Sequence, residues 1–119
     1  MRVFDFGSNW QVFSEQRVDA QRLAVAARSL QALLQRDTLK GVSVLDVGCG
    51  SGLFSIAAHQ LGASKVVGVD VNPRCVAVSE QNHARLAPSA VMTFQEASAL
   101  SPQSMQPLGL FDLVYAWGS

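Results

Sequence analysis

The sequence is short of cysteine and has no excess charge of either sign. Two cysteines in 119 residues are too few for the disulfide framework of a small secreted domain, so we expect a reducing, cytoplasmic setting. Nine lysines and arginines balance nine aspartates and glutamates. The chain therefore lacks the basic surplus typical of proteins that bind nucleic acids, and we expect no nucleic-acid partner.

Long apolar runs and metal-ligand patterns are also missing. No stretch approaches the ~18 uninterrupted apolar residues of a membrane-spanning helix, and residues 1–6 reach an acid before a signal-like apolar core develops. His59 and His83 have no cysteine or carboxylate at ligand spacing. These absences argue against a membrane protein, a secreted protein and a metal site.

Apolar residues are present in the amount that one packed core needs. Hydrophobic residues make up 49% of the chain and charged residues 15%, so we expect residues 1–119 to form a single unit. Residues 1–13 are an aromatic N-terminal segment, residues 14–40 hold a helix, and residues 41–119 form the core of the domain. The helix is expected over residues 14–35, and its apolar face is made by Leu23, Ala27, Leu30 and Leu34.

Strand and helix patterns alternate after residue 41. Apolar runs predict strands over residues 42–47, 66–69, 90–94 and 110–116. One helix is predicted over residues 52–61, where Gly62 ends it. A second helix is predicted to start at Asn72 and Pro73 and to run to about residue 86. This alternation predicts an α/β fold with a parallel sheet, strand order 3-2-1-4 and a ligand crevice between strands 1 and 4. Strand 4 would then be an uncovered edge, and the chain looks cut short.

A glycine-rich turn follows the first predicted strand. Gly48, Gly50 and Gly52 let the backbone approach a ligand closely, and Cys49 lies among them. Dinucleotide-binding turns have the wider spacing G-x-G-x-x-G and hold a pyrophosphate. Here Asp46 precedes the turn, and its carboxylate would repel a pyrophosphate but suits an ammonium group, directly or through water.

Acidic residues also end the next two strands. Asp70 closes the second strand and can accept two charge-assisted hydrogen bonds from a ribose diol. Val71, the next residue, could lie against a purine ring or simply belong to the core. After the third strand, Glu96 could accept from an exocyclic adenine amine, and the backbone N–H of Ala97 could donate to a ring nitrogen. We therefore predict a site for a ligand with a ribose, an adenine and an amino group.

These residues resemble the motifs of class I S-adenosylmethionine-dependent methyltransferases. Residues 45–52 (LDVGCGSG) fit the first motif of that family closely, and residues 68–73 (GVDVNP) look like the second, whose acid holds the ribose. Residues 96–97 (EA) resemble the adenine-binding pair, although Asp is commoner there, and residues 111–118 (FDLVYAWG) are similar to the strand-4 motif beside the methyl donor. The resemblance implies S-adenosyl-L-methionine as cofactor, bound by Asp46, Gly48, Cys49, Gly50, Gly52, Asp70, Val71, Glu96, Ala97 and Tyr115.

The resemblance covers residues from about 40 to the end and implies a Rossmann-like fold that is incomplete. Strands 5–7 of the family and most of the acceptor site are absent, as is the Asn/Asp-Pro-Pro-Tyr/Phe signature of many nucleic-acid and amide N-methyltransferases. We expect a small-molecule methyl acceptor. The sequence nominates no catalytic residue, although Tyr115 and Trp117 are best placed to line the methyl-transfer end or, equally, to pack at the strand edge.

Other interpretations stay open at this point. A nicotinamide-dependent (NAD(P)) oxidoreductase with an unusual turn is one, and a truncated, inactive cofactor-binding or interaction module is another. Phe6, Trp10 and Phe13 could form a lid over the cofactor or an apolar staple on the sheet edge. The oligomeric state is undetermined by the sequence.

Overall fold

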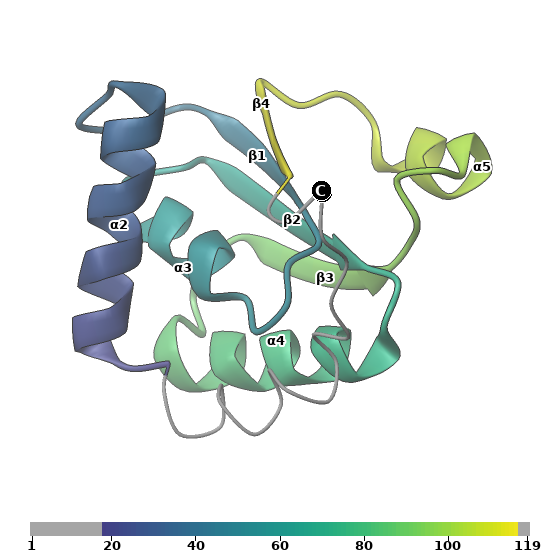
Figure 1. The fold of residues 1–119 in the computed structure, drawn as a ribbon, viewed down its shortest axis with the longest axis horizontal. Helices are drawn as coiled ribbons and strands as arrows, with labels where there is room; N and C mark the ends of the chain where they lie inside the picture. Colours follow the sequence, from purple (N-terminus) through teal and green to yellow (C-terminus); the bar gives the residue numbers. More distant parts are fainter. Residues whose placement is uncertain (1–17, 117–119) are drawn as a thin grey trace.

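The computed structural model describes residues 18–116, which form a parallel four-stranded sheet flanked by helices (Figure 1). The strands run in the spatial order β3-β2-β1-β4, and each neighbouring pair is parallel. Their bounds are β1 Ser43–Val47, β2 Lys65–Asp70, β3 Met92–Glu96 and β4 Leu113–Ala116. The predicted α/β class and the predicted strand order 3-2-1-4 are confirmed.

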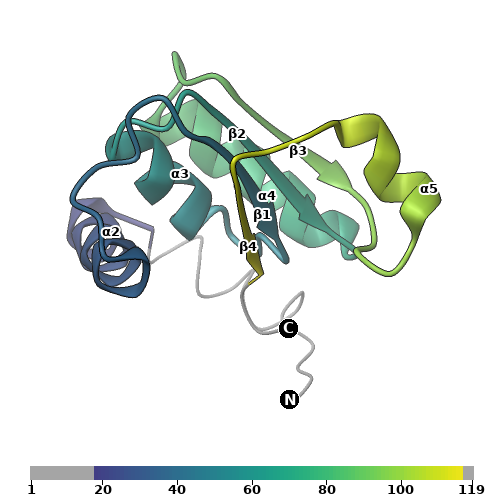
Figure 2. The same ribbon diagram turned by 90° about the horizontal axis from the view of Figure 1, so that it is seen from above.

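The helices lie in two layers, one on each face of the sheet. They are α2 Ala20–Leu34, α3 Leu53–Gln60, α4 Pro73–Leu86, the short α5 Pro102–Met105 and the 3-10 turn η1 Gln106–Leu108. The first three pack on one face, where α2 contacts α3 and α4 contacts β3. Figure 2 shows α5 on the side of the sheet away from α2. Within residues 18–116, none of these helices combines the length and apolar character needed to cross a bilayer.

Helix α2 begins later than the sequence pattern suggested. Asp19 has an extended backbone and its carboxylate accepts a hydrogen bond from the Arg22 N–H across 2.8 Å, so it is the N-cap and the helix starts at Ala20 rather than near residue 14. The predicted apolar face is buried at Leu23 and Leu30. The aromatic segment of residues 1–13, with its proposed lid, lies outside the described residues.

Both outer strands begin later than the sequence predicted. β3 begins at Met92, two residues after the predicted start, because a turn in which the Ala90 N–H bonds to the Ala87 carbonyl precedes it. β4 begins at Leu113, because its pairing with β1 starts only where Leu113 lies beside Val44. Apolar runs in this chain thus extend into the connections that precede the strands.

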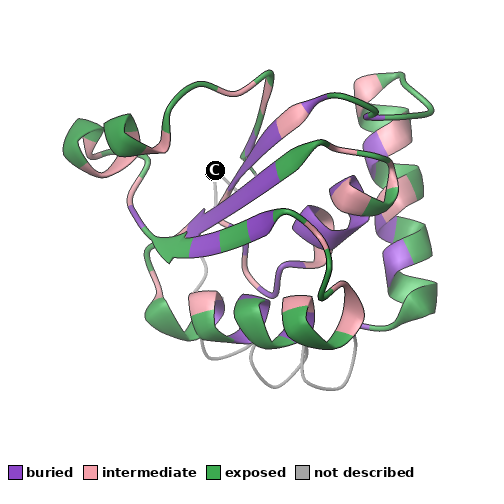
Figure 3. Ribbon diagram, turned by 180° about the vertical axis from the view of Figure 1, so that it is seen from behind, coloured by how far each residue is buried: buried purple, intermediate pink, exposed green. Residues whose placement is uncertain are grey.

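Two apolar clusters sandwich the sheet. The larger lies under α2, α3 and α4, and the smaller joins Leu45, Val67 and Val69 to the segment that contains α5 and η1. Figure 3 shows that β1 and β2 are buried along most of their length, whereas the outer strand β3 alternates between buried and exposed residues. Because β1 and β2 are paired and are covered on both faces, their ends lie side by side in a packed environment.

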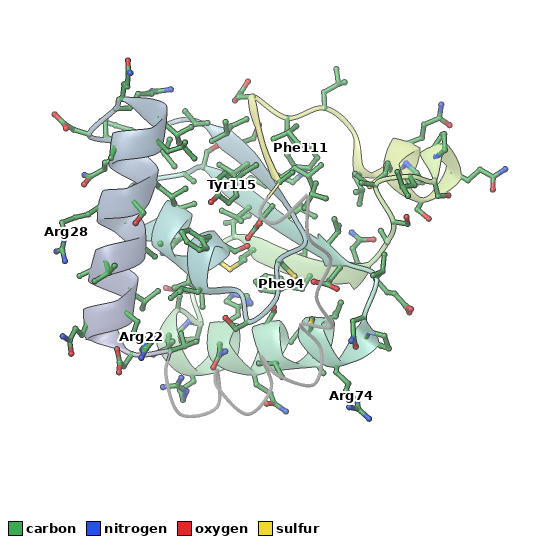
Figure 4. The ribbon with its side chains drawn as sticks, viewed as in Figure 1. Arg22, Arg28, Arg74, Phe94, Phe111 and Tyr115 are labelled. Carbon is green, nitrogen blue, oxygen red and sulfur yellow. The ribbon has the colours of Figure 1, made fainter. Side chains whose placement is uncertain are left out.

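One aromatic ring of the outer strand β3 covers part of β2. Phe94 of β3 lies between the sheet and α4 (Figure 4). A Cβ atom placed on Gly68 of β2 would lie only 2.5 Å from Cδ1 of the Phe94 ring. The absence of a side chain at Gly68 therefore allows the Phe94 ring to cover the backbone of β2 just before that strand reaches Asp70.

Candidate functional site

The glycine turn joins β1 to α3 and is anchored on the end of β2. Gly48, Gly50 and Gly52 have φ angles of 76°, 58° and 82°, which L-residues with side chains rarely adopt. The N–H groups of Gly48 and Cys49 both donate to the carbonyl of Val69, at 2.8 and 2.9 Å. The turn is therefore held against β2 by backbone hydrogen bonds, and its conformation depends on the three glycines.

Gly50 exposes its backbone. A Cβ atom built on Gly50 would meet nothing within 4 Å, whereas one on Gly52 would press on Ser79 at 3.2 Å and on Phe94 at 3.3 Å. Gly52 is thus required by packing against the protein itself. Gly50 leaves open space, and a ligand can approach the main chain there.

Asp70 lies beside the turn, as the sequence predicted. Its Oδ2 accepts a hydrogen bond from the Gly50 N–H across 3.1 Å, and its Oδ1 accepts one from the Asn72 N–H across 2.9 Å. The residue is partly exposed. Each carboxylate oxygen has a second acceptor position, so Asp70 can bind a diol while it holds the turn.

Asp46, which the sequence predicted to face an ammonium group directly or through water, is buried at the end of β1. Only 2% of the residue is exposed, and its Oδ2 accepts a hydrogen bond from the Ser55 hydroxyl across 2.7 Å. Within the described part of the chain, its Oδ1 has no hydrogen-bond partner. Burial raises the pKa of Asp46 to about 6; the Ser55 hydrogen bond opposes this shift and the charge of Asp70 adds to it.

A small cavity lies next to Asp46, on the face of the sheet that α2 and α3 cover. Its volume is about 10 Å³, close to the space of one water molecule, and it is lined by Leu30, Leu39, Val44, Asp46, Phe54, Ala58, Leu113 and Tyr115. Tyr115 pairs with Phe54, with 5.6 Å between ring centroids, and is 9% exposed. Burial, with the nearby charge of Asp46, raises the pKa of Tyr115. Tyr115 thus lies beside Asp46 as part of the core, and Trp117 is outside the described residues.

The residues predicted to hold an adenine occupy the same edge of the sheet. Val71 follows Asp70 directly and is 65% exposed, so its apolar side chain is available to a ring. Glu96 is exposed and lies opposite Asp70 in the β2–β3 register. The N–H of Ala97 already donates to the carbonyl of Asp70 across 3.0 Å, so the structure uses this predicted adenine donor within the protein.

Helix α4 contributes polar groups that the sequence interpretation missed. The Ser79 hydroxyl donates to the Gly50 carbonyl across 2.9 Å, and the Asn82 side chain donates to the Ser51 carbonyl across 3.0 Å. Cys49 is also buried against Ser79, and this burial raises the pKa of its thiol. The sequence signal that could have indicated these groups is the spacing of Ser79 and Asn82, which are three residues apart and so lie on one face of α4.

The topology and the turn define the class of the protein. A crystal structure of a protein from Methanococcus maripaludis, assigned as an S-adenosyl-L-methionine-dependent methyltransferase, shares the fold with a TM-score of 0.71 at 16% identity, and covers 100% of this chain and 53% of that one. Ribosomal protein L11 methylase from Lactobacillus delbrueckii subsp. bulgaricus superposes with a TM-score of 0.57 at 30% identity over 81% of this chain and 44% of that one. The chain has the cofactor-binding fold of the class I S-adenosylmethionine-dependent methyltransferases.

Sequence comparison names the family within this class. The family model of ribosomal protein L11 methyltransferase (PrmA) matches residues 24–116, and the chain belongs to this family. The ribosomal protein L11 methyltransferase of Xanthomonas oryzae pv. oryzae is 38% identical over 96 residues, which are 81% of this chain and 29% of the relative. That of Xanthomonas campestris pv. campestris is 44% identical over 72 residues, 60% of this chain and 24% of the relative. The chain therefore spans less than a third of these relatives.

The family corrects one expectation from the sequence. A small-molecule methyl acceptor was expected, but the matching relatives are named for a ribosomal protein as acceptor. The prediction of a small-molecule acceptor is wrong, because the glycine turn and the acids at the strand ends do not indicate which acceptor is bound. Cofactor motifs are shared across the class and carry no information about the acceptor.

Proposed function

We propose that this chain binds S-adenosyl-L-methionine at the carboxyl ends of β1 and β2, and that it serves methyl transfer to a protein acceptor. The observation that carries the proposal is the Asp70 carboxylate, which accepts a hydrogen bond from Gly50 in a glycine turn within the residues that match the PrmA family. Asp70 and the turn come from different strands, and the sheet brings them together at the edge where α/β folds bind ligands.

The available groups fit an adenosyl ligand. Asp70 would accept from the ribose hydroxyls, Val71 would cover one face of the adenine, and Glu96 would accept from its exocyclic amine. The open space at Gly50 would admit the ligand to the main chain. Oδ1 of Asp46 is a buried acceptor with no partner among the described residues, and it would receive the ammonium group through one ordered water.

The cofactor supplies an activated methyl group on a sulfonium, so the protein has mainly to align the acceptor with it. Proximity and orientation provide much of the acceleration in such a reaction. A general base is required only where the acceptor must lose a proton, and we assign none among the described residues. In this proposal Tyr115 packs beside Asp46 in the core under the site and does not take part in the chemistry.

The names of the relatives indicate the acceptor. We infer that the protein acceptor is ribosomal protein L11, because the family and its curated members carry that name. The test is transfer of a labelled methyl group from S-adenosyl-L-methionine to purified L11. Cofactor binding without any transfer by the chain would favour the alternative of a binding module without catalysis.

Isothermal titration distinguishes the proposal from a nicotinamide-dependent oxidoreductase. We expect S-adenosyl-L-methionine and S-adenosylhomocysteine to bind, and NADH and NADPH not to bind, because the buried Asp46 carboxylate lies just before the turn where a pyrophosphate would sit. Binding of NADPH without binding of either adenosyl compound would overturn the proposal. The cytoplasmic setting expected from the sequence stays a prediction.

A further inference from the structure

The face of α4 that meets the glycine turn carries two buried polar side chains. Ser79 is 0% exposed and Asn82 is 4% exposed. Each donates to a carbonyl of the turn: Ser79 to Gly50 across 2.9 Å, and Asn82 to Ser51 across 3.0 Å. Two consecutive peptide groups of the turn are thus oriented by side chains from a helix that follows the next strand in the chain.

Arg85 extends this arrangement away from the turn. Its Nη2 donates to Oδ1 of Asn82 across 3.1 Å and to the carbonyl of Val18 across 2.8 Å. An arginine can only donate, so it requires the oxygen of the Asn82 amide on its side and leaves the NH₂ group for Ser51. Val18 immediately precedes Asp19, the N-cap of α2. A continuous chain of hydrogen bonds therefore runs from the start of α2, through α4, to the turn.

The hydrogen bonds act on a segment that needs support. Gly50 and Gly52 have positive φ angles and no side chains, so the unsupported turn has many accessible conformations. In a trans peptide the N–H points opposite to the C=O. When Ser79 holds the Gly50 carbonyl toward α4, the Ser51 N–H has to point away from α4. The side chains of α4 thereby set the direction of a backbone donor in the turn.

We propose that Ser79, Asn82 and Arg85 are positioning residues that hold the glycine turn in its cofactor-binding conformation. Arg85 also connects this conformation to the start of α2. This inference rests on the proposed function, because the cofactor is the ligand whose site is pre-organised. Pre-organisation reduces the conformational entropy lost on binding, so its removal weakens binding while the fold is retained.

The isosteric change Asn82→Asp tests the central residue. An aspartate keeps the shape and can still accept from Arg85, but it cannot donate to the Ser51 carbonyl and places a negative charge against it. We expect roughly 10-fold weaker binding of S-adenosylhomocysteine, the order of magnitude for one lost hydrogen bond with a buried partner. The matched control is Gln81→Glu, the same chemical change on the neighbouring exposed residue of α4, which leaves the affinity unchanged.

Hydrogen exchange, measured on the full chain without ligand, distinguishes a role in holding the turn from a general contribution to the stability of the fold. We expect the amides of residues 50–52 to exchange faster in Asn82→Asp, while the amides of β1 and β2 keep their protection. Equal exchange at the turn, or a uniform loss of protection throughout the chain, would overturn the proposal. If Asn82→Asp does not fold, Arg85→Ala, at an exposed position, carries the same test.

The two readouts separate the two proposals. If the wild-type chain does not bind S-adenosylhomocysteine, the proposed function fails, whereas the exchange experiment still determines whether α4 holds the turn. If the wild type binds and Asn82→Asp binds equally well, the positioning role fails and the proposed function stands.

Discussion

The Ser55 hydroxyl donates a hydrogen bond to Oδ2 of Asp46 across 2.7 Å in the interior of the protein. Ser55 is fully buried on α3, and Asp46 lies beneath it on β1. This single bond does not compensate for the loss of water around the carboxylate, since the pKa of Asp46 is raised to about 6. The stability of the protein should therefore depend on pH through the Asp46 carboxylate.

The pKa of Asp46 predicts lower stability at neutral pH than at mildly acidic pH. Burial raises the pKa of this carboxyl to about 6 in the folded chain, whereas in the unfolded chain the pKa has its ordinary value of 3.8. Between these values the folded state binds more protons, so the contribution of this group to the unfolding free energy decreases as pH rises from below about 4 to above about 6, by about 3 kcal/mol in total. Urea denaturation of the wild type and of Asp46→Asn across this range measures the difference. A constant difference between the two would contradict the prediction.

Asp70→Asn should weaken cofactor binding. The amide keeps one oxygen acceptor, but the charge that strengthens the hydrogen bonds to Gly50 and to a ribose is lost. We expect about 10- to 100-fold weaker binding of S-adenosylhomocysteine, from a charge-assisted hydrogen bond of about 1.5–3 kcal/mol. Asp112→Asn is the matched control, because Asp112 precedes β4 and bonds to Ser43 at the opposite end of the strands. Equal losses in the two variants would show that the effect is not local to the site.

Gly50→Ala and Gly41→Ala form a matched pair that separates backbone strain from ligand contact. Both glycines have positive φ angles, 58° and 77°, and an added Cβ would meet nothing within 4 Å at either position. Each substitution should lower the unfolding free energy by about 1–2 kcal/mol through the left-handed backbone. Only Gly50→Ala should weaken S-adenosylhomocysteine binding in isothermal titration. Similar affinities in the two variants would mean that the ligand does not approach the backbone at Gly50.

Gly68→Ala should destabilise the chain through its clash with Phe94. The added Cβ would lie 2.5 Å from Cδ1 and 2.6 Å from Cε1 of that ring, so the ring has to move. Overpacking of this kind costs about 1–3 kcal/mol in unfolding free energy. In a double-mutant cycle, Phe94→Leu should remove part of this cost, since the smaller side chain leaves room for the methyl group. Additive effects of the two substitutions would contradict the clash.

The local elements of the fold could largely be predicted from the sequence. The Asn72–Pro73 helix start is confirmed, since the Asn72 side chain accepts from the Arg74 N–H, and Gly62 has the expected positive φ angle after α3. Such signals involve neighbouring residues only. The outer strands begin later than predicted because their starts depend on pairing with β1 and β2, which no single segment encodes.

The candidate site was predicted less completely. Asp70 lies where it was expected, at the end of a strand and against the turn. The support from Ser79, Asn82 and Arg85 was not predicted, because a polar residue on a helix shows its buried face only once the helix is packed. The acceptor was predicted wrongly, because the cofactor motifs say nothing about it.

The sequence by itself determined the alternation of strands and helices, the glycine turn and the acids at the strand ends, because periodicity and backbone preference act over a few residues. Only the tertiary structure decided that Asp46 is buried under Ser55 and that α4 holds the carbonyls of the turn. Burial and long-range hydrogen bonds depend on which surfaces pack together, and packing unites residues that are distant in the chain.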